Sequence, residues 1–278
     1  MLLAIDVGNT NIVFALVDIG VDLGAEGDDI RQRWRISTDG NRTADEYAVW
    51  LHQLMALEGV ERAHIDAAII ATVVPATLFN LQRLCRKYFN VEALVVGTPD
   101  MVYGIALAVD NPNEVGADRI VNAVAAHATT PGNLIVVDFG TATTFDVITE
   151  GASGQGEYRG GAIAPGINLS MDALYSHAAK LPRIAVEPPP GNGPNATGSA
   201  IGTNTVHAMQ SGVFWGYVGL IEGLVARITS DIGMPVTVIG TGGLATLFNR
   251  HTHAIDRVDG DLTIRGLRRI HALNTNGA

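Results

Sequence analysis

The segment Leu2-Leu3-Ala4-Ile5-Asp6-Val7-Gly8-Asn9-Thr10-Asn11 opens the chain and decides its fold class. Leu2–Ile5 predicts a strand, the polar stretch with Gly8 predicts a turn, and Ile12–Val17 predicts a second strand. Near the midpoint the same pattern returns in the segment Leu134-Ile135-Val136-Val137-Asp138-Phe139-Gly140-Thr141-Ala142-Thr143-Thr144-Phe145. A strand, an Asp-x-Gly turn and a second strand in each half indicate a duplicated α/β architecture.

The repeat predicts two domains of similar size. We place their boundary near residue 130, in Thr129-Thr130-Pro131-Gly132-Asn133. Residues 1–130 then form an N-terminal half with the first turn, and residues 131–278 form a C-terminal half with the second. A length of 278 residues with 47% hydrophobic composition is enough for two modest cores.

Several local patterns support the α/β class. Thr43-Ala44-Asp45-Glu46 has the spacing of a capping box and predicts a helix start. Ala67–Val74 and Val91–Val96 are apolar runs separated by helix-like Ala76–Phe89, as in a βαβ unit. Thr203–Ser230 predicts one long helix with glycines at positions 212, 216, 219 and 223. Glycine weakens a helix interior, so these glycines indicate close packing, either within the subunit or at a subunit interface.

Composition excludes some classes of partner. With 18 Lys+Arg against 28 Asp+Glu, the formal net charge is -10, which disfavours nucleic acid. Cys85 is the single cysteine, so an intramolecular disulfide is excluded and a reducing compartment, the cytoplasm, is expected. The apolar start is too short for a signal peptide and no apolar run reaches the ~20 residues that span a bilayer, so no membrane partner is expected.

The turns suggest how the chain could bind phosphate. Neither GxxxxGK[ST] nor GxGxxG occurs. Asp-x-Gly turns suit phosphate, because glycine permits close backbone approach and amides and hydroxyls donate hydrogen bonds. Asp6 would then face the metal ion that bridges the phosphates; the alternative is that Asp6 merely stabilises a tight hairpin. A third glycine-rich stretch, Val238–Leu244, is either a surface for adenine and ribose or a tight strand-to-helix connection.

The motif Gly116-Ala117-Asp118-Arg119 opens a predicted helix over Ile120–His127. An Asp in the first turn of a helix is most often a favourable charge near the helix N-terminus. Adjacent helical residues do not face each other, so Arg119 is not simply the ion-pair partner of Asp118. Its guanidinium could bind a carboxylate in a bidentate manner.

Five motifs together resemble the type III pantothenate kinase family, in the family's order over residues 1 to about 250. They are Asp6-Val7-Gly8-Asn9-Thr10-Asn11, Gly116-Ala117-Asp118-Arg119, Val137-Asp138-Phe139-Gly140-Thr141-Ala142-Thr143-Thr144, Gly160-Gly161-Ala162-Ile163-Ala164-Pro165-Gly166 and Asn204-Thr205-Val206-His207-Ala208-Met209-Gln210-Ser211-Gly212. The resemblance implies two ribonuclease-H-like halves, as in actin and sugar kinases, with ATP between them. It implies phosphorylation of pantothenate with ATP and Mg²⁺, the first step of coenzyme A synthesis, by a homodimer that requires potassium or ammonium.

The resemblance also implies roles for individual residues. Asp118 would accept the proton, Asp138 would bind the monovalent cation, and Asp6 is a candidate magnesium ligand. ATP would contact the first turn and one residue of the second: Asp6, Val7, Gly8, Asn9, Thr10, Asn11, Ile12, Val13 and Thr141. Pantothenate would contact Tyr103, Gly116, Ala117, Asp118, Arg119 and Thr205.

The chain's two lysines, Lys87 and Lys180, lie outside the proposed phosphate turns. A bound cation at Asp138 would therefore supply positive charge that the loops lack.

The chain departs from the family pattern in three places. They are a longer tip at Asp18–Asp29, an extra loop at Glu187–Ala200, and Gly240 where alanine is more usual. The extra loop directly precedes Thr205, one of the residues expected to contact pantothenate. The rival hypothesis is a nucleotide-binding regulatory protein that keeps the fold without turnover, and the presence of Asp6, Asp118, Arg119 and Asp138 argues against it.

Overall fold

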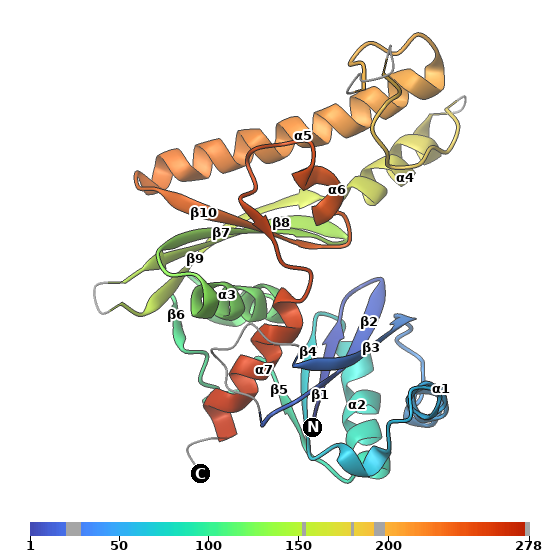
Figure 1. The fold of residues 1–278 in the computed structure, drawn as a ribbon, viewed down its shortest axis with the longest axis vertical. Helices are drawn as coiled ribbons and strands as arrows, with labels where there is room; N and C mark the ends of the chain where they lie inside the picture. The colour runs from blue at the N-terminus through green and yellow to red at the C-terminus, as the bar shows by residue number, and fades with distance from the viewer. Residues whose placement is uncertain (21–28, 152–153, 179–180, 192–197, 276–278) are drawn as a thin grey trace. The chain divides into compact units, whose positions relative to one another are not determined.

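The computed structural model describes residues 1–20, 29–151, 154–178, 181–191 and 198–275 (Figure 1). The chain divides into two compact units. Unit 1 comprises Met1–Pro131, Glu150–Tyr158 and Asp261–Ala278, and unit 2 comprises Gly132–Thr149 and Arg159–Gly260. Parts of the predicted tip (18–29) and of the extra loop (187–200) lie outside the described residues.

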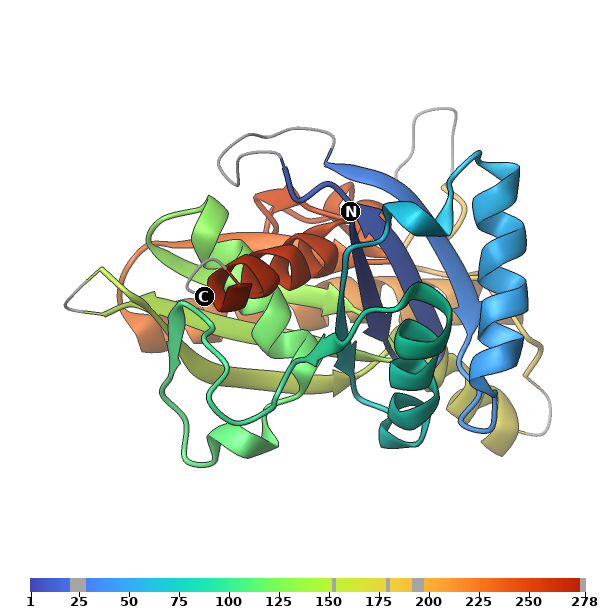
Figure 2. The same ribbon diagram turned by 90° about the horizontal axis from the view of Figure 1, so that it is seen from below.

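The units differ from the two continuous segments that the sequence repeat suggested. The chain does pass from unit 1 to unit 2 at Pro131 and Gly132, close to the expected boundary. However, helix α7 (Leu262–Thr275) returns to unit 1, because it packs on α3 (Ala117–Thr129) and on strand β1 (Leu2–Val7). Figure 2 shows α7 lying alongside α3.

Unit 1 is built on a mixed five-stranded sheet of order β3-β2-β1-β4-β5. β1, β2 (Asn11–Val17) and β3 (Ile30–Ser37) are antiparallel neighbours, whereas β4 (Ala67–Thr72) and β5 (Ala93–Val95) continue the sheet in parallel with β1. β4, helix α2 (Pro75–Leu84) with its π-helical turn Cys85–Phe89, and β5 form the predicted βαβ unit, which is confirmed.

The two faces of β1 have different neighbours. Leu3, Ile5 and Val7 belong to one core cluster with Tyr47 and Leu51 of α1 (Ala44–Leu57). Side chains alternate along a strand, so Leu2, Ala4 and Asp6 point to the opposite face, where α7 contacts β1 and α3 contacts β4. Asp6 therefore lies on the face of the sheet that carries α3.

Helix α1 begins as the sequence predicted. Thr43 and Glu46 form both hydrogen bonds of a capping box, which satisfy two amide groups at the helix start.

Cys85, in the π-helical turn after α2, is fully buried, and burial raises the pKa of its thiol to about 12. The thiol stays protonated and takes no part in the site described below.

Helices α3 and α7 meet at a glycine. A Cβ on Gly266 would lie 2.1 Å from the carbonyl oxygen of Val121, so only glycine permits this approach of the two backbones. Thr263 of α7 also donates a hydrogen bond to Asn122 Oδ1 of α3 at 2.8 Å. These contacts fix α3, the helix whose first turn carries Asp118.

Unit 1 also contains two short 3₁₀ turns, Arg62–His64 and Pro112–Glu114, and strand β6 (Ile105–Leu107). β6 pairs in parallel with the first residues of β9 (Gly156–Pro165), namely Gly156, Glu157 and Tyr158. This pairing places the segment that precedes α3 beside Tyr158.

Unit 2 contains the second hairpin. β7 (Asn133–Phe139) pairs antiparallel with β8 (Ala142–Glu150) and parallel with β10 (Val236–Gly242), and the strand order is β11-β10-β7-β8-β9, with β11 at Arg257–Val258. The remaining helices are α4 (Ile167–His177), α5 (Thr205–Ile232) and α6 (Ala245–Asn249).

The faces of β7 repeat the arrangement of β1. Ile135, Val137 and Phe139 share a core cluster with Phe214 and Ile221 of α5, and Figure 1 shows α5 running across this sheet. Alternation then directs Leu134, Val136 and Asp138 to the other face. Asp6 and Asp138 thus occupy equivalent positions at the ends of equivalent strands.

The long helix is confirmed as α5, a single helix of 28 residues. No other described element packs against its glycines: apart from the backbone of α5 itself, no described atom lies within 4 Å of the position of a Cβ on Gly212, Gly216 or Gly219, and a Cβ on Gly223 would meet only Arg227 Nη1 of the same helix, at 3.2 Å. The tight packing within the subunit that these glycines suggested is therefore wrong, and the subunit-interface hypothesis remains.

Across the described ranges, no helix combines the length and the apolar character needed to cross a membrane.

Candidate functional site

The first turn, between β1 and β2, is held by backbone hydrogen bonds and by one threonine. The Gly8 amide donates to the Asn11 carbonyl at 3.0 Å. From the end of β3, the Thr38 hydroxyl donates to the Gly8 carbonyl at 2.6 Å and the Thr38 amide donates to the Thr10 carbonyl at 3.0 Å. Asn9 and Thr10 are exposed. The turn therefore has a fixed backbone and presents polar groups to solvent.

The start of α3 lies beside this turn. The amide of Val73, which follows β4, donates to the Val7 carbonyl at 3.1 Å. Val73 Cγ1 in turn lies 3.8 Å from the position of a Cβ on Gly116, the N-cap of α3. The carboxyl end of the sheet thus brings together the first turn, Gly116 and Asp118.

Gly116 also leaves room for the carboxylate of Asp118. A Cβ on Gly116 would lie 2.6 Å from Asp118 Oδ1. Any other residue at 116 would therefore displace this carboxylate or move the helix start. The glycine of the Gly116-Ala117-Asp118-Arg119 motif has a steric role next to the proposed base.

Two opposing effects act on the charge of Asp118. Burial raises the pKa of the Asp118 carboxyl above its usual value, while the Arg119 amide, which donates to Oδ1 at 2.8 Å, and the Arg119 charge lower it. Burial is the larger effect, so the pKa is raised. A carboxylate whose pKa is raised is a stronger base, which suits it to accept a proton.

The Arg119 guanidinium lies 5.8 Å from the centre of the Tyr158 ring, a cation–π contact.

The second turn, between β7 and β8, is enclosed by glycines from other segments. The Gly140 amide donates to the Ala142 carbonyl at 3.1 Å, and the Gly166 amide donates to the Thr141 carbonyl at 3.1 Å. A Cβ on Gly166 would lie 2.2 Å from that Thr141 oxygen. Gly166, the N-cap of α4, therefore positions the backbone of Thr141, while the Thr141 side chain is exposed.

Gly242, at the end of β10, lies against Asp138. It has φ +86°, a backbone conformation that favours glycine, and a Cβ there would meet Asp138 Oδ1 at 2.6 Å and the Phe139 carbonyl oxygen at 2.7 Å. The Phe139 amide nitrogen lies 2.8 Å from the same position. Glycine at 242 thus allows the end of β10 to lie directly against Asp138 and the Phe139 backbone.

Position 240, where the sequence comparison expected alanine, leaves limited room for a side chain. A Cβ on Gly240 would lie 3.2 Å from Ile255 Cγ2, which is tight but involves a movable side chain. An alanine is therefore compatible with the fold if Ile255 shifts by a few tenths of an ångström.

Thr205 begins α5 in unit 2 and is exposed. Asn204 caps the helix by accepting a hydrogen bond from the His207 amide at 3.0 Å. The ends of the extra loop are tied to the same helix: Gln210 donates to Glu187 at 2.6 Å, and Ser211 donates to the Ala200 carbonyl at 2.6 Å. The described parts of the extra loop therefore do not disrupt the first turn of α5.

Tyr103 lies away from Asp118. Its hydroxyl accepts a hydrogen bond from the Gly97 amide at 3.1 Å, and its side chain lines a cavity together with His127, in the last turn of α3. Asp118 is in the first turn of that helix, about 13 Å from His127 along the axis at the usual rise per residue. The contact of Tyr103 with pantothenate stays a prediction that this placement does not favour.

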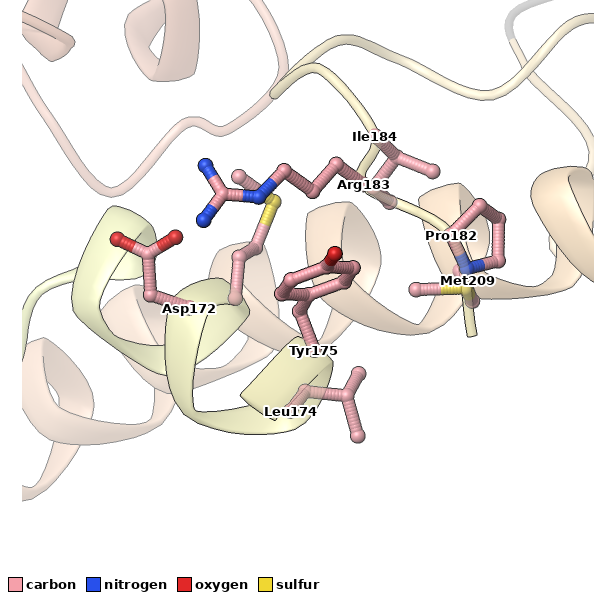
Figure 3. A pocket seen from close by; sticks show the side chains of 8 residues that line it. Asp172, Leu174, Tyr175, Pro182, Arg183, Ile184 and Met209 are labelled. Carbon is pink, nitrogen blue, oxygen red and sulfur yellow. The ribbon is translucent and has the colours of Figure 1, made fainter. Parts of the chain in front are cut away.

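A pocket of about 220 Å³ lies beside α4 and the start of α5 (Figure 3). Its wall is largely apolar and includes Leu174, Pro182 and Met209. The Arg183 guanidinium lies 4.7 Å from the centre of the Tyr175 ring, and Figure 3 shows it extending toward Asp172. None of the residues predicted to contact substrate lines this pocket.

The predicted residues thus divide between the units. Unit 1 brings together the first turn, Gly116, Asp118 and Arg119, and unit 2 brings together Asp138 and Thr141, with Thr205 at the start of α5. Sequence reasoning missed Thr38 and the steric roles of Gly166 and Gly242. Gly166 and Gly242 stood within glycine-rich motifs that signalled importance, but their contacts join segments far apart in sequence.

Comparison with known proteins identifies the family. A family model described as type III pantothenate kinase matches residues 2–227. A type III pantothenate kinase from Rhizorhabdus wittichii is 60% identical over 267 residues, covering 96% of each chain. One from Rhodospirillum rubrum is 56% identical over 274 residues, covering 99% of each chain.

Solved structures agree on the fold. A structure described as a Baf-family transcriptional activator from Campylobacter jejuni has a TM-score of 0.56 at 18% identity, covering 99% of both chains. A structure described as a 2-dehydro-3-deoxygalactonokinase from Sinorhizobium meliloti has a TM-score of 0.56 at 14% identity, covering 100% of this chain and 98% of that one. At such identities the likeness concerns the fold alone, the duplicated ribonuclease-H-like architecture of sugar kinases. The family match and the near-complete overlap with these relatives show that the chain belongs to the type III pantothenate kinase family.

Proposed function

We propose that this protein transfers the γ-phosphoryl group of ATP to the primary hydroxyl of pantothenate, the first step of coenzyme A synthesis. Family membership supports the overall reaction. The structural observation that carries it is the placement of Asp118, a carboxylate with a raised pKa, beside the first turn at the carboxyl end of the unit 1 sheet.

Asp118 acts as the proton acceptor. As the pantothenate oxygen bonds to the γ-phosphorus, its proton passes to Asp118, and the bond between the γ-phosphorus and the departing ADP oxygen breaks. A positioned general base contributes about 10²- to 10⁴-fold in rate. The rest of the acceleration comes from orientation and charge neutralisation around a loose transition state.

Other residues hold the two substrates. Arg119 binds the pantothenate carboxylate through its guanidinium, and Gly116, Ala117 and Thr205 complete that contact. The first turn, residues 6–13, and Thr141 bind the ATP phosphates through amides and hydroxyls. Asp6, half-buried at the end of β1, is the ligand we assign to Mg²⁺, which neutralises phosphate charge and is commonly held by one or two carboxylates plus phosphates.

Asp138 binds the monovalent cation. The support is the position of Asp138 at the end of β7, with the Phe139 carbonyl oxygen close to its carboxylate, because carboxylate and carbonyl oxygens are the ligands that hard cations prefer. A potassium or ammonium ion there supplies positive charge near the phosphates. Initial rates in matched potassium and sodium chloride, with ammonium removed, should show strong activation by potassium only; equal rates would remove this assignment.

The protein acts as a homodimer through α5. Gly212, Gly216 and Gly219 have open space where side chains would be, and such small residues let a second backbone approach closely. Gly216→Leu should convert the dimer to monomers in light scattering, whereas Gly260→Ala, at another open position, should not. A monomeric wild type would end this proposal. A cytoplasmic location stays a prediction from the sequence.

A coupled ADP-release assay tests the proposed reaction. We expect ADP release that depends on pantothenate, together with a product heavier by one phosphoryl group in mass spectrometry. ATP binding without pantothenate-dependent release would instead favour the regulatory-protein hypothesis.

A further inference from the structure

A second cavity in unit 1 lies at the end of α3 that is remote from Asp118. It measures about 440 Å³, within the range of small-molecule sites. It is formed by the last turns of α3, the start of β6, the residues before β9, and α7. Its lining residues are Tyr103, Gly104, Ile105, Val124, His127, Ala128, Gly154, Gln155 and Arg269.

The side chains of Arg269, His127 and Gln155 supply hydrogen-bond donors to this cavity, and no carboxylate is among its described lining residues. Within the described part of the chain, neither Arg269 nor His127 forms an ion pair or a hydrogen bond through its side chain. The neighbouring Arg268 differs, because it is buried in an ion pair with Asp29 at 2.5 Å. Arg268 is thus structural, whereas Arg269 faces the cavity.

Gly156 sets the position of the His127 ring. A Cβ on Gly156 would lie 2.7 Å from the ring atoms Cδ2 and Cγ of His127. Glycine at 156 therefore allows the imidazole to lie directly against the β9 backbone. An imidazole has an N–H donor in either neutral tautomer and two when charged.

We propose that this cavity binds a small anion, a carboxylate or phosphate group attached to an apolar body. The Arg269 guanidinium can donate two parallel hydrogen bonds to either group, and His127 and Gln155 can add donors. The C-terminus of α3 carries about half a negative charge from the helix dipole, so it opposes a bound anion only in part. Ile105, Val124 and Ala128 provide the apolar wall.

The occupant is not the substrate that reacts at Asp118. Nine residues of helix separate Asp118 from His127, about 13 Å at the usual rise. The cavity and the first turn thus lie at opposite ends of the same helix. The proposal is independent of the pantothenate kinase reaction and would stand if that reaction were not observed.

The test follows the imidazole resonances of the full-length protein by NMR during titration with inorganic phosphate, acetate and hexanoate. His127→Gln identifies the His127 signal. We expect a saturable shift of this signal with phosphate or with hexanoate. The anion that causes the shift identifies the preferred head group. Acetate should bind more weakly than hexanoate.

Arg269→Gln should weaken binding at least tenfold, whereas Arg62→Gln, which removes an exposed arginine of the same unit, should leave it unchanged. Circular dichroism melting would establish that both variants are folded. Absence of a saturable shift with every anion, or equal affinity in wild type and Arg269→Gln, would overturn the proposal. Equal binding of acetate and hexanoate would overturn the apolar part.

Discussion

The two strand-turn-strand hairpins share a sequence pattern but are supported in different ways. In the first, residues 8–11 lie between paired Val7 and Ile12; in the second, residues 140–142 lie between paired Phe139 and Thr143. The second turn is therefore one residue shorter. Thr38 supports the first turn by hydrogen bonds, whereas the backbones of Gly166 and Gly242 enclose the second.

This difference separates two kinds of support. A hydrogen bond from a side chain can be lost at moderate cost. A backbone contact that leaves no space for a Cβ tolerates no larger residue without movement of the main chain. We therefore expect substitutions around the second turn to affect stability more than substitutions around the first.

The largest effect is expected for Gly242→Ala. The substitution combines an unfavourable positive φ with contacts at 2.6 Å to Asp138 Oδ1 and 2.7 Å to the Phe139 carbonyl. Strain and overpacking together should lower the free energy of unfolding by roughly 2–5 kcal/mol, and potassium activation of the folded fraction should disappear. Denaturant titration measures the first effect and initial rates measure the second.

Gly243→Ala is the matched control, because no described atom lies within 4 Å of its Cβ position and its φ is not in the positive range. Its free energy of unfolding should stay within about 0.5 kcal/mol of wild type. Equal stability of the two variants would mean that the second turn is not enclosed as described.

Gly166→Ala should have a smaller effect. Its φ of −64° and ψ of 153° suit any residue, so the penalty comes from steric contacts alone, at 2.2 Å with the Thr141 carbonyl oxygen and at 2.7 Å with the Gly140 carbonyl oxygen. Overpacking of this kind costs about 1–3 kcal/mol, which denaturant titration resolves. Gly260→Ala, in open space, is the control, and a Gly166→Ala variant as stable as that control would contradict the account.

In the first turn, Thr38→Val should cost about 0.5–1.5 kcal/mol, since it removes one hydrogen bond to the Gly8 carbonyl. Thr38→Ser keeps the hydroxyl and should retain most of that stability. The Michaelis constant for ATP should rise for the valine variant more than for the serine variant. Indistinguishable variants would show that Thr38 does not support the turn.

The smallest change is a shift in pH dependence. Asp118 must be ionised to accept a proton, so kcat/KM should fall as pH decreases through its pKa. Burial raises that pKa, so the acid limb should lie above the usual value of 3.8 for an aspartate. Arg119→Gln removes a charge that lowers the pKa and should move the limb higher still. A limb at 3.8 or below would contradict the raised pKa.

Sequence periodicity was sufficient to predict both hairpins, the βαβ unit and α5, because each depends on local alternation, capping or glycine punctuation. The return of α7 to unit 1 was not predictable in this way. It depends on Gly266 meeting the backbone of Val121, a contact between segments that no local pattern connects.

The same contrast between local sequence patterns and contacts of distant segments applies to the site. The motifs identified Asp6, Asp118 and Asp138, since strand alternation and helix starts fix where they lie. Tyr103 was assigned by resemblance, and the structure places it beside His127, at the other end of α3 from Asp118. Steric roles such as that of Gly242 require the three-dimensional contact itself.

The most direct test of the central claim compares wild type with Asp118→Asn. The substitution removes basicity at nearly constant shape, so the pantothenate-dependent rate should fall by about 100-fold or more. The affinity for ATP by calorimetry should stay nearly unchanged. The free energy of unfolding at neutral pH should not decrease, because the folded state disfavours the charged form of Asp118. An Asp118→Asn variant that is well folded and keeps more than about a tenth of the wild-type rate would contradict the assignment of Asp118 as the base.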